Sequence, residues 1–226
     1  MSLCEVEIKS FLGSKERAAE VKNKLHALDP NTKFVSRHKQ LNHYFTDGDF
    51  EKLREHLSPQ SGEKDRKELK LIIENGSNFS VRTRLIDNER LIFVIKASLD
   101  GGTSHNTISR KELEVELKNM TLEELDQLLL DADFKYQAKW SREREEYKSS
   151  NITVCFDKNA GYGYIAEFEK LVDKESCAPL ARKELSQFMD KLGVLELPQD
   201  RLERMFAHYN ENWAKYYGTD NIFVIT

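Results

Sequence analysis

The sequence predicts an α+β protein in which eight antiparallel strands close into a small barrel, with helices around it and a helical extension at the C-terminus. Three observations lead to this fold class. Eight segments alternate apolar and polar side chains with a period of two, as half-buried strands do. Other segments carry apolar residues at the three- and four-residue spacing of amphipathic helices. Eight strands with hairpin-type connections are enough to close a small barrel.

The eight predicted strands are separated by helices or by turn-forming residues. They comprise residues 3–11, 34–46, 78–85, 91–98, 107–117, 134–147, 151–157 and 164–171. The pair Asp87-Asn88 and the segment 159–163 are typical of turns, since Asn, Asp and Gly tolerate turn conformations. The run Asp100-Gly101-Gly102 indicates a flexible loop. Hairpin-type connections of this kind predict an antiparallel sheet.

Six further segments show helical spacing of apolar residues. They comprise residues 14–28, 50–57, 63–74, 120–132, 178–192 and 199–217. Signals at their ends support the assignment. Pro30 lies just beyond the first helix, Thr121 and Glu124 have the spacing of a capping box, and Gly193 follows the fifth helix.

Composition excludes several classes of protein. Lys and Arg number 35 against 39 Asp and Glu, so the formal net charge is −4 and a general basic surface for duplex nucleic acid is absent. No run approaches the roughly 20 apolar residues that span a bilayer, and the first nine residues are too charged for a signal peptide. Three cysteines without C-x-x-C spacing argue against disulfides and zinc sites. We therefore expect a cytoplasmic protein that contacts neither duplex nucleic acid nor membrane.

Charged residues gather on single faces of several predicted strands and are sorted by sign. These faces carry Glu5, Glu7 and Lys9; Arg82 and Arg84; Lys96; Arg110, Glu112, Glu114 and Glu116; Arg142 and Arg144; and Glu167 and Glu169. Each face taken alone could be solvated. A solvated face, however, tolerates Ser, Thr, Asn and Gln as well, and adjacent like charges destabilise a sheet unless something neutralises them. The joint pattern favours charged faces that line the inside of a barrel, with the apolar faces packed against helices.

A lining of both signs indicates the chemistry of the ligand. Carboxylates are the groups that hard cations such as Mg²⁺ and Mn²⁺ prefer, whereas Arg and Lys bind phosphate oxygens. A bare anion would need only the cationic side chains, and a bare metal only the carboxylates. The pattern therefore predicts an anion with several phosphate groups that arrives with a divalent metal ion.

Short motifs, in order along the chain, are similar to those of the CYTH superfamily, the triphosphate tunnel metalloenzymes. Glu5-Val6-Glu7-Ile8-Lys9 resembles the E-x-E-x-K signature of this superfamily. The motifs that follow are Tyr44-Phe45, Arg82-Thr83-Arg84, Lys96, Arg110-Lys111-Glu112-Leu113-Glu114, Arg142-Glu143-Arg144 with Tyr147, Phe156-Asp157, Gly161-Tyr162-Gly163 and Glu167-Phe168-Glu169. Arg142 stands where lysine is common. The series covers about three quarters of the chain.

The resemblance implies a tunnel domain over residues 1–171, with residues 172–226 as a helical extension packed on the same domain. It also implies roles for single residues. The implied metal ligands are Glu5, Glu7, Glu112, Glu114, Asp157, Glu167 and Glu169. The implied phosphate-binding residues are Lys9, Arg82, Arg84, Lys96, Arg142 and Arg144. Glu5, Glu7 and Lys9 are the implied catalytic residues, and Glu116 lies outside the family pattern.

The expected function is hydrolysis of a triphosphate with Mg²⁺ or Mn²⁺ as cofactor. The substrate would be tripolyphosphate, ATP or another nucleoside triphosphate, or thiamine triphosphate. An alternative is a class IV adenylyl cyclase, which would make cAMP and pyrophosphate from ATP and resembles this chain in its E-V-E-I-K start. A non-catalytic binder of polyphosphate or of a nucleotide is a third hypothesis. The motifs leave these alternatives open, and they leave open a monomer or a homodimer.

Overall fold

The computed structural model describes residues 4–98 and 110–224, without the side chains of Cys4, Arg110 and Glu175. The strands are β1 (Cys4–Gly13), β2 (Lys33–Thr46), β3 (Ser77–Ile86), β4 (Arg90–Ser98), β5 (Arg110–Leu117), β6 (Lys135–Ser149), β7 (Ile152–Asn159) and β8 (Gly163–Val172). The helices are α1 (Lys15–Leu28), α2 (Phe50–Leu57), α3 (Glu63–Asn75), α4 (Leu122–Asp131), α5 (Ala178–Leu192) and α6 (Gln199–Asn212). None of the described helices is long and apolar enough to cross a membrane.

The eight strands form one sheet in the order β1-β8-β7-β6-β2-β3-β4-β5. The ladders within each half of this order are antiparallel. The predicted α+β class and the eight antiparallel strands are therefore confirmed. Strands β1 and β5 stand at the two ends of the order, so backbone hydrogen bonds of the described residues do not close the sheet.

Local signals account for most element boundaries. Thr121 and Glu124 form the predicted capping box of α4, and Gly193 ends α5 in the left-handed conformation. Asp87 and Asn88 both have positive φ, as the tight turn between β3 and β4 requires.

The prediction for residues 199–217 is wrong at its end. Helix α6 stops at Asn212, and a single 3₁₀ turn follows, Trp213–Lys215. The Asn212 side chain donates to the backbone carbonyl of His208 and so satisfies a carbonyl of the last turn. The predicted loop at residues 100–102, and residues 3 and 107–109 of the predicted strands, lie outside the described residues.

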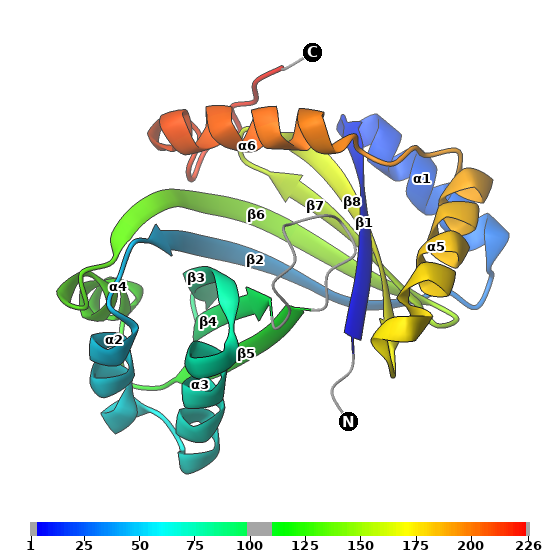
Figure 1. Ribbon diagram of the computed structural model, residues 1–226. Helices are drawn as coiled ribbons and strands as arrows, with labels where there is room; N and C mark the ends of the chain where they lie inside the picture. The colour runs from blue at the N-terminus through cyan, green and yellow to red at the C-terminus, as the bar shows by residue number, and fades with distance from the viewer. Residues whose placement is uncertain (1–3, 99–109, 225–226) are drawn as a thin grey trace. The chain divides into compact units, whose positions relative to one another are not determined.

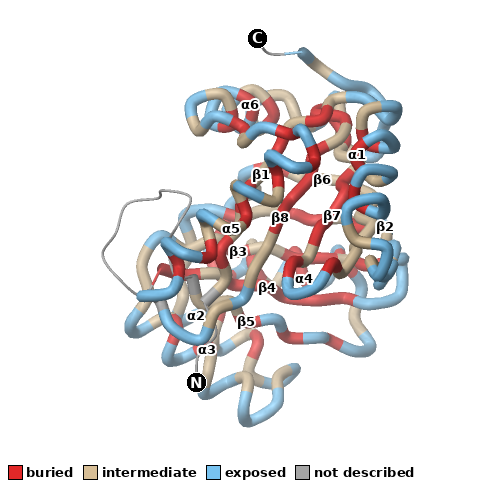
Figure 2. The backbone as a smooth tube through the Cα atoms, turned by 90° about the vertical axis from the view of Figure 1, so that its right-hand side faces the viewer, coloured by how far each residue is buried: buried red, intermediate tan, exposed pale blue. Residues whose placement is uncertain are grey.

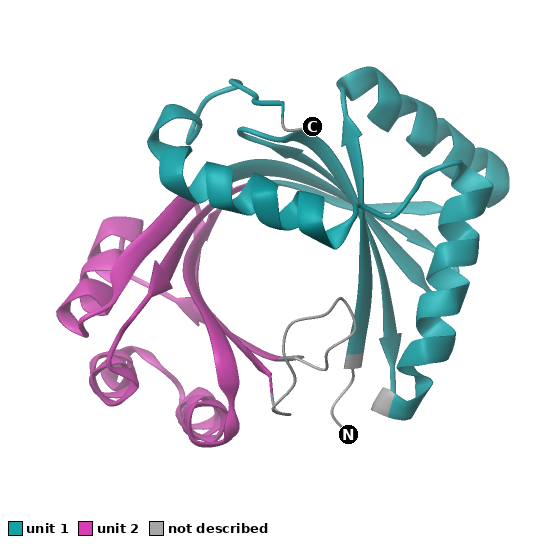
Figure 3. Ribbon diagram, turned by 45° about the horizontal axis from the view of Figure 1, so that its top comes forward, with its two compact units in different colours: residues 1–38, 104–109, 141–226 teal, residues 39–103, 110–140 magenta. Residues whose placement is uncertain are grey.

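The chain divides into two compact units (Figure 3). In the described chain, unit 1 comprises residues 4–38 and 141–224, and unit 2 comprises residues 39–98 and 110–140. Strands β2 and β6 contribute residues to both units. The predicted division at residues 171 and 172 follows the family motifs rather than this partition and stays a prediction.

The core of unit 1 lies between the sheet and two helices. Figure 1 shows α1 and α5 beside β1, and both helices pack on β1 and β8. The apolar faces of β1, β7 and β8 supply Val6, Ile8, Val154, Phe156 and Phe168 to one buried cluster with the helices. Buried residues are also prominent along β7 and β8 in Figure 2. The predicted packing of apolar strand faces against helices is thus confirmed in this unit.

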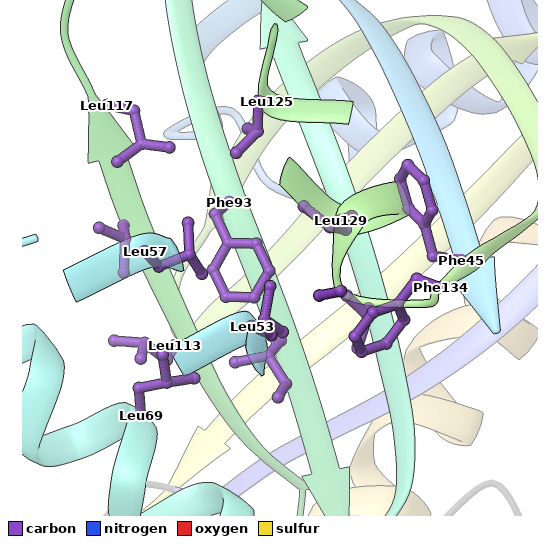
Figure 4. Close-up of a cluster of buried hydrophobic side chains, with 14 of the residues drawn as sticks. Phe45, Leu53, Leu57, Leu69, Phe93, Leu113, Leu117, Leu125, Leu129 and Phe134 are labelled. Atoms are coloured by element: carbon purple, nitrogen blue, oxygen red, sulfur yellow. The ribbon is translucent and has the colours of Figure 1, made fainter. Parts of the chain in front are cut away.

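The core of unit 2 is a separate apolar cluster. Phe93 of β4 is completely buried among leucines of the covering helices, among them Leu53, Leu57 and Leu125 (Figure 4). Leu69 of α3 joins the same cluster. The opposite face of β3, β4 and β5 is left for the charged side chains that the sequence places there.

The C-terminal segment is fastened to the hairpin between β7 and β8 by aromatic and backbone contacts. Tyr209 of α6 is fully buried and lies against Tyr162 at a ring separation of 5.4 Å. Gly161 exchanges backbone hydrogen bonds with Asn221 and Phe223. Ile222 also forms an isolated parallel β-bridge with Gly161. Tyr209 is therefore a packing residue, as its helical spacing predicts.

Candidate functional site

The charged faces predicted from the sequence exist in both units. On β1, Val6 and Ile8 are each 1% exposed in the core, whereas Glu5, Glu7 and Lys9 are half-buried on the other face. Unit 1 holds Glu5, Glu7, Lys9, Arg142, Arg144, Asp157, Glu167 and Glu169. Unit 2 holds Arg82, Arg84, Lys96, Glu112 and Glu114. Every predicted site residue therefore lies on one of two charged faces.

Strand register brings the predicted residues of unit 1 side by side. Lys9 is directly opposite Glu167, and Glu7 is directly opposite Glu169, across the β1–β8 ladder. Arg144 is opposite Asp157 across the β6–β7 ladder. Residues two apart on a strand share a face, so segments far apart in sequence build one continuous surface.

Three carboxylates of this face are gathered closely enough to hold a metal ion. One oxygen each of Glu5, Glu7 and Glu169 lies within 4.8 Å of the others. Burial, together with the charges of Glu167 and Glu5, raises the pKa of Glu169 to about 7. A divalent cation would relieve this crowding of like charges, and carboxylate oxygens are the ligands that Mg²⁺ and Mn²⁺ prefer. These residues fit a divalent metal.

Two other carboxylates of unit 1 are neutralised by cationic side chains. Asp157 is 1% exposed and accepts from Arg142 Nη1 at 2.8 Å, from Arg144 Nε at 2.8 Å and from Arg144 Nη2 at 2.7 Å. Glu167 contacts Arg144 and accepts from Lys9 Nζ at 2.8 Å. Burial would raise the pKa of Glu167, but Arg144 and Lys9 outweigh it and hold that pKa well below its usual range.

In unit 2, Glu112 links two of the predicted phosphate-binding residues. Its Oε1 accepts from Arg82 Nη2 at 3.0 Å, and its Oε2 lies 2.9 Å from Lys96 Nζ. Tyr44 OH accepts from Arg82 Nη1 at 2.8 Å. The Arg82 Nε–H is buried and has no hydrogen-bond partner among the described residues, so one donor of this guanidinium is left for a ligand.

Arg84 is held from two sides. Its Nε donates to Asn42 Oδ1 at 2.9 Å, and its Nη1 donates to Glu114 Oε1 at 2.7 Å. The Glu114 side chain is 46% exposed, whereas that of Arg84 is 10% exposed. Glu116, which lies outside the family pattern, forms an exposed pair with Arg90.

Sequence reasoning missed several members of these faces. Ile92 and Val94 share the face of Lys96 on β4 and are buried, so this face is not purely charged. Glu146 follows Arg142 and Arg144 at the same period of two and stands opposite Cys155, which lies on the same face. These four residues are Ile92, Val94, Glu146 and Cys155. Extending the alternation along each strand would have identified them, because the strand register places them beside predicted site residues.

The comparison with known families decides the identity of the fold. A model of the CYTH domain matches residues 75–201, which is more than half of the 226-residue chain. The chain belongs to the CYTH domain family. The CYTH match contains every predicted site residue except Glu5, Glu7 and Lys9, which precede it. No curated protein matches the chain.

Solved structures share the CYTH fold of this chain. The PH1819 protein of Pyrococcus horikoshii OT3 is 20% identical, with a TM-score of 0.60 over 92% of this chain and 99% of that one. A candidate adenylate cyclase from Vibrio parahaemolyticus is 12% identical, with a TM-score of 0.57 over 90% and 99%. A candidate adenylyl cyclase from Hippeastrum, which reveals a dominant triphosphatase activity, is 16% identical, with a TM-score of 0.51 over 90% and 95%. At these identities the likeness shows the fold alone.

Proposed function

We propose that this CYTH protein is a divalent-metal-dependent triphosphatase that releases phosphate from an inorganic or organic triphosphate. The observation that supports this most is the charged face of unit 1. There, the closely spaced carboxylates Glu5, Glu7 and Glu169 share a surface with the cations Lys9 and Arg144. A metal-bound polyphosphate needs both kinds of group.

Glu5, Glu7 and Glu169 would hold the metal ion, with Mg²⁺ and Mn²⁺ as the candidates. The bound ion would neutralise phosphate charge and lower the pKa of a coordinated water. Glu112, Glu114, Asp157 and Glu167 stay proposed as assisting ligands. In the protein as described these four carboxylates all accept from cationic side chains.

The cationic side chains would bind and orient the phosphate groups. In unit 1, Asp157 fixes the guanidinium planes of Arg142 and Arg144, so these donors are preorganised for phosphate oxygens. In unit 2, Arg82, Arg84 and Lys96 would take the same role, with the unpartnered Arg82 Nε–H as one donor. Fixed positive charge stabilises the transition state of phosphoryl transfer and orients the phosphoryl group for in-line attack.

Adenylyl cyclase activity is the second candidate, because the Glu5-Val6-Glu7-Ile8-Lys9 start resembles that of class IV cyclases. In that reaction the ribose 3′-hydroxyl replaces water as the nucleophile and attacks the α-phosphorus, and pyrophosphate leaves. The same carboxylates and cations would serve both reactions. The two functions therefore differ in product rather than in the residues they require.

A product-resolved substrate screen tests the proposal. The purified chain is incubated with tripolyphosphate, ATP, GTP or thiamine triphosphate, under Mg²⁺ and separately under Mn²⁺. Phosphate release from any of them supports the triphosphatase. Formation of cAMP and pyrophosphate from ATP would instead identify the protein as an adenylyl cyclase. Tight binding without turnover under either metal would identify it as a non-catalytic binder.

A further inference from the structure

A buried carboxylate on the back of the unit 2 sheet lies directly behind the arginines of the charged face. Asp126 of α4 is 3% exposed and belongs to the helix face that otherwise carries Leu122, Leu125 and Leu129. A carboxylate in such an apolar setting is costly unless it is hydrogen-bonded. The side chains that donate hydrogen bonds to Asp126 therefore indicate its role.

Three side chains from three strands satisfy Asp126. Thr83 Oγ1 of β3 donates to Oδ1 at 2.7 Å, while His43 Nδ1 of β2 at 2.6 Å and Tyr136 OH of β6 at 2.7 Å donate to Oδ2. Burial raises the pKa of Asp126, but the hydrogen bonds from His43, Thr83 and Tyr136 outweigh it and lower that pKa. The ionised carboxylate thus joins α4 to three strands.

The rungs of the β2–β3 ladder connect this network to the front of the sheet. His43 pairs with Thr83, and both point backward to Asp126. The flanking rungs pair Asn42 with Arg84 and Tyr44 with Arg82, and in each of them the β2 side chain accepts a hydrogen bond from the arginine. The His43–Thr83 pair, which contacts Asp126 behind the sheet, therefore lies between the two residue pairs whose arginines project from the front.

We propose that Asp126 is a positioning residue for Arg82 and Arg84. By holding Thr83 and His43 together, it fixes the register and spacing of β2 against β3, and thereby the directions in which Asn42 and Tyr44 aim the two guanidinium groups. Preorganised donors bind phosphate more tightly than donors that must be ordered on binding. The effect on triphosphate affinity rests on the proposed function, whereas the effect on the arginines does not.

Position 83 provides the sharpest variants. Thr83→Val removes the hydroxyl with little change of shape, and Thr83→Ser keeps it. Asp126→Asn removes the charge. Leu129→Val is the matched control, because Leu129 is a fully buried residue of the same helix and its truncation loosens the packing of α4 without touching the polar network.

The first readout is the NMR signal of each arginine Nε–H, assigned with Arg82→Lys and Arg84→Lys variants of the full chain. Thr83→Val and Asp126→Asn should shift or broaden both arginine signals and speed their hydrogen exchange, while Thr83→Ser and Leu129→Val leave them near wild type. If both signals stay unchanged in Thr83→Val and Asp126→Asn, or if Leu129→Val moves them equally, the positioning role is overturned.

The second readout is tripolyphosphate affinity, measured by calorimetry without divalent metal so that no turnover occurs. Thr83→Val should raise Kd roughly 5- to 10-fold, the size expected for one buried hydrogen bond, and Thr83→Ser should restore it. An unchanged Kd in Thr83→Val would overturn the link between the network and affinity. If the wild type binds no tripolyphosphate without metal, the arginine signals decide the positioning role, and the substrate screen with Mg²⁺ and Mn²⁺ decides the proposed function.

Discussion

Single carboxylates of the unit 1 face differ in how their charge is balanced. Asp157 and Glu167 accept hydrogen bonds from arginine and lysine, so each is held in place. Glu169 has the opposite environment, since burial and two neighbouring carboxylates raise its pKa. On one surface, Asp157 and Glu167 thus position cationic side chains, whereas the environment of Glu169 suits a metal ion.

Replacement of Glu7 by Gln should abolish most turnover on the triphosphate that the substrate screen identifies. The neutral amide keeps the size of the side chain but removes one of three charges that would hold the metal. Loss of a partner in the outer shell of a metal site costs about 10- to 100-fold, so loss of a ligand should lower kcat/KM by at least about 100-fold. Full activity of Glu7→Gln with added Mg²⁺ or Mn²⁺ would mean that the metal assignment is wrong. Glu116→Gln, on an exposed glutamate paired with Arg90, should stay near wild type.

Glu169 should make the metal-free protein less stable as pH rises. Its folded pKa, about 7, lies above the ordinary value of 4.5, so between these values the folded protein holds more protons than the unfolded chain. The free energy of unfolding therefore falls as pH rises through this window, by an upper limit of about 3 kcal/mol from this group.

Glu169→Gln isolates that contribution. Urea unfolding in EDTA at pH 5 and pH 8 should show the variant more stable than wild type at pH 8 and near it at pH 5. Added Mg²⁺ at pH 8 should then raise the Tm of wild type more than that of the variant. Parallel pH profiles for the two proteins would contradict the crowding of charge inferred at this site.

At the level of the elements, alternation along strands carried most of what the sequence could predict. The period of two placed Glu5 and Lys9 on one face and Val6 and Ile8 on the other, because side-chain direction in a strand is set by position alone. The network around Asp126 could not be predicted in this way. Helical spacing identifies the buried face of α4, but the partners of Asp126 come from three strands whose pairing only the folded sheet determines.

The hairpin between β7 and β8 should depend on Gly163. This residue has φ +76°, and a Cβ placed there would lie 2.3 Å from the carbonyl oxygen of Gly13 on β1. Gly163→Ala therefore combines a left-handed conformation, which costs about 1–2 kcal/mol, with a backbone clash that costs about 1–3 kcal/mol.

Gly218 provides the matched control for this prediction. It has φ +72°, but among the described residues a Cβ there would have no atom within 4 Å apart from its own chain neighbours. Gly218→Ala should show the conformational cost alone. In denaturant unfolding, Gly163→Ala should lose more free energy of unfolding than Gly218→Ala, and the difference should equal the cost of the clash. Equal losses in the two variants would show that β1 moves to make room for the added Cβ.

For the whole molecule, the three closely spaced carboxylates proposed to hold the metal lie in unit 1, whereas the proposed phosphate-binding residues lie in both units. Unit 1 contains the carboxylate group of Glu5, Glu7 and Glu169 and its own core under α1 and α5. Unit 2 contains Arg82 and a separate core under α2, α3 and α4. A ligand that binds only the native state stabilises the groups that contact it. Metal and phosphate should therefore leave different protection patterns along the chain.

Hydrogen exchange measured by mass spectrometry can test this division. Mg²⁺ alone should slow exchange in β1 and β8, which carry the three carboxylates, and leave β3 near its metal-free rate. Tripolyphosphate alone should slow exchange in β3, because Arg82 and Arg84 lie there. Glu7→Gln should lose the response to Mg²⁺ and keep the β3 response to tripolyphosphate. If Mg²⁺ protects β3 as strongly as β1, the expected confinement of the metal response to unit 1 is wrong, because local protection follows local binding only when the units open independently.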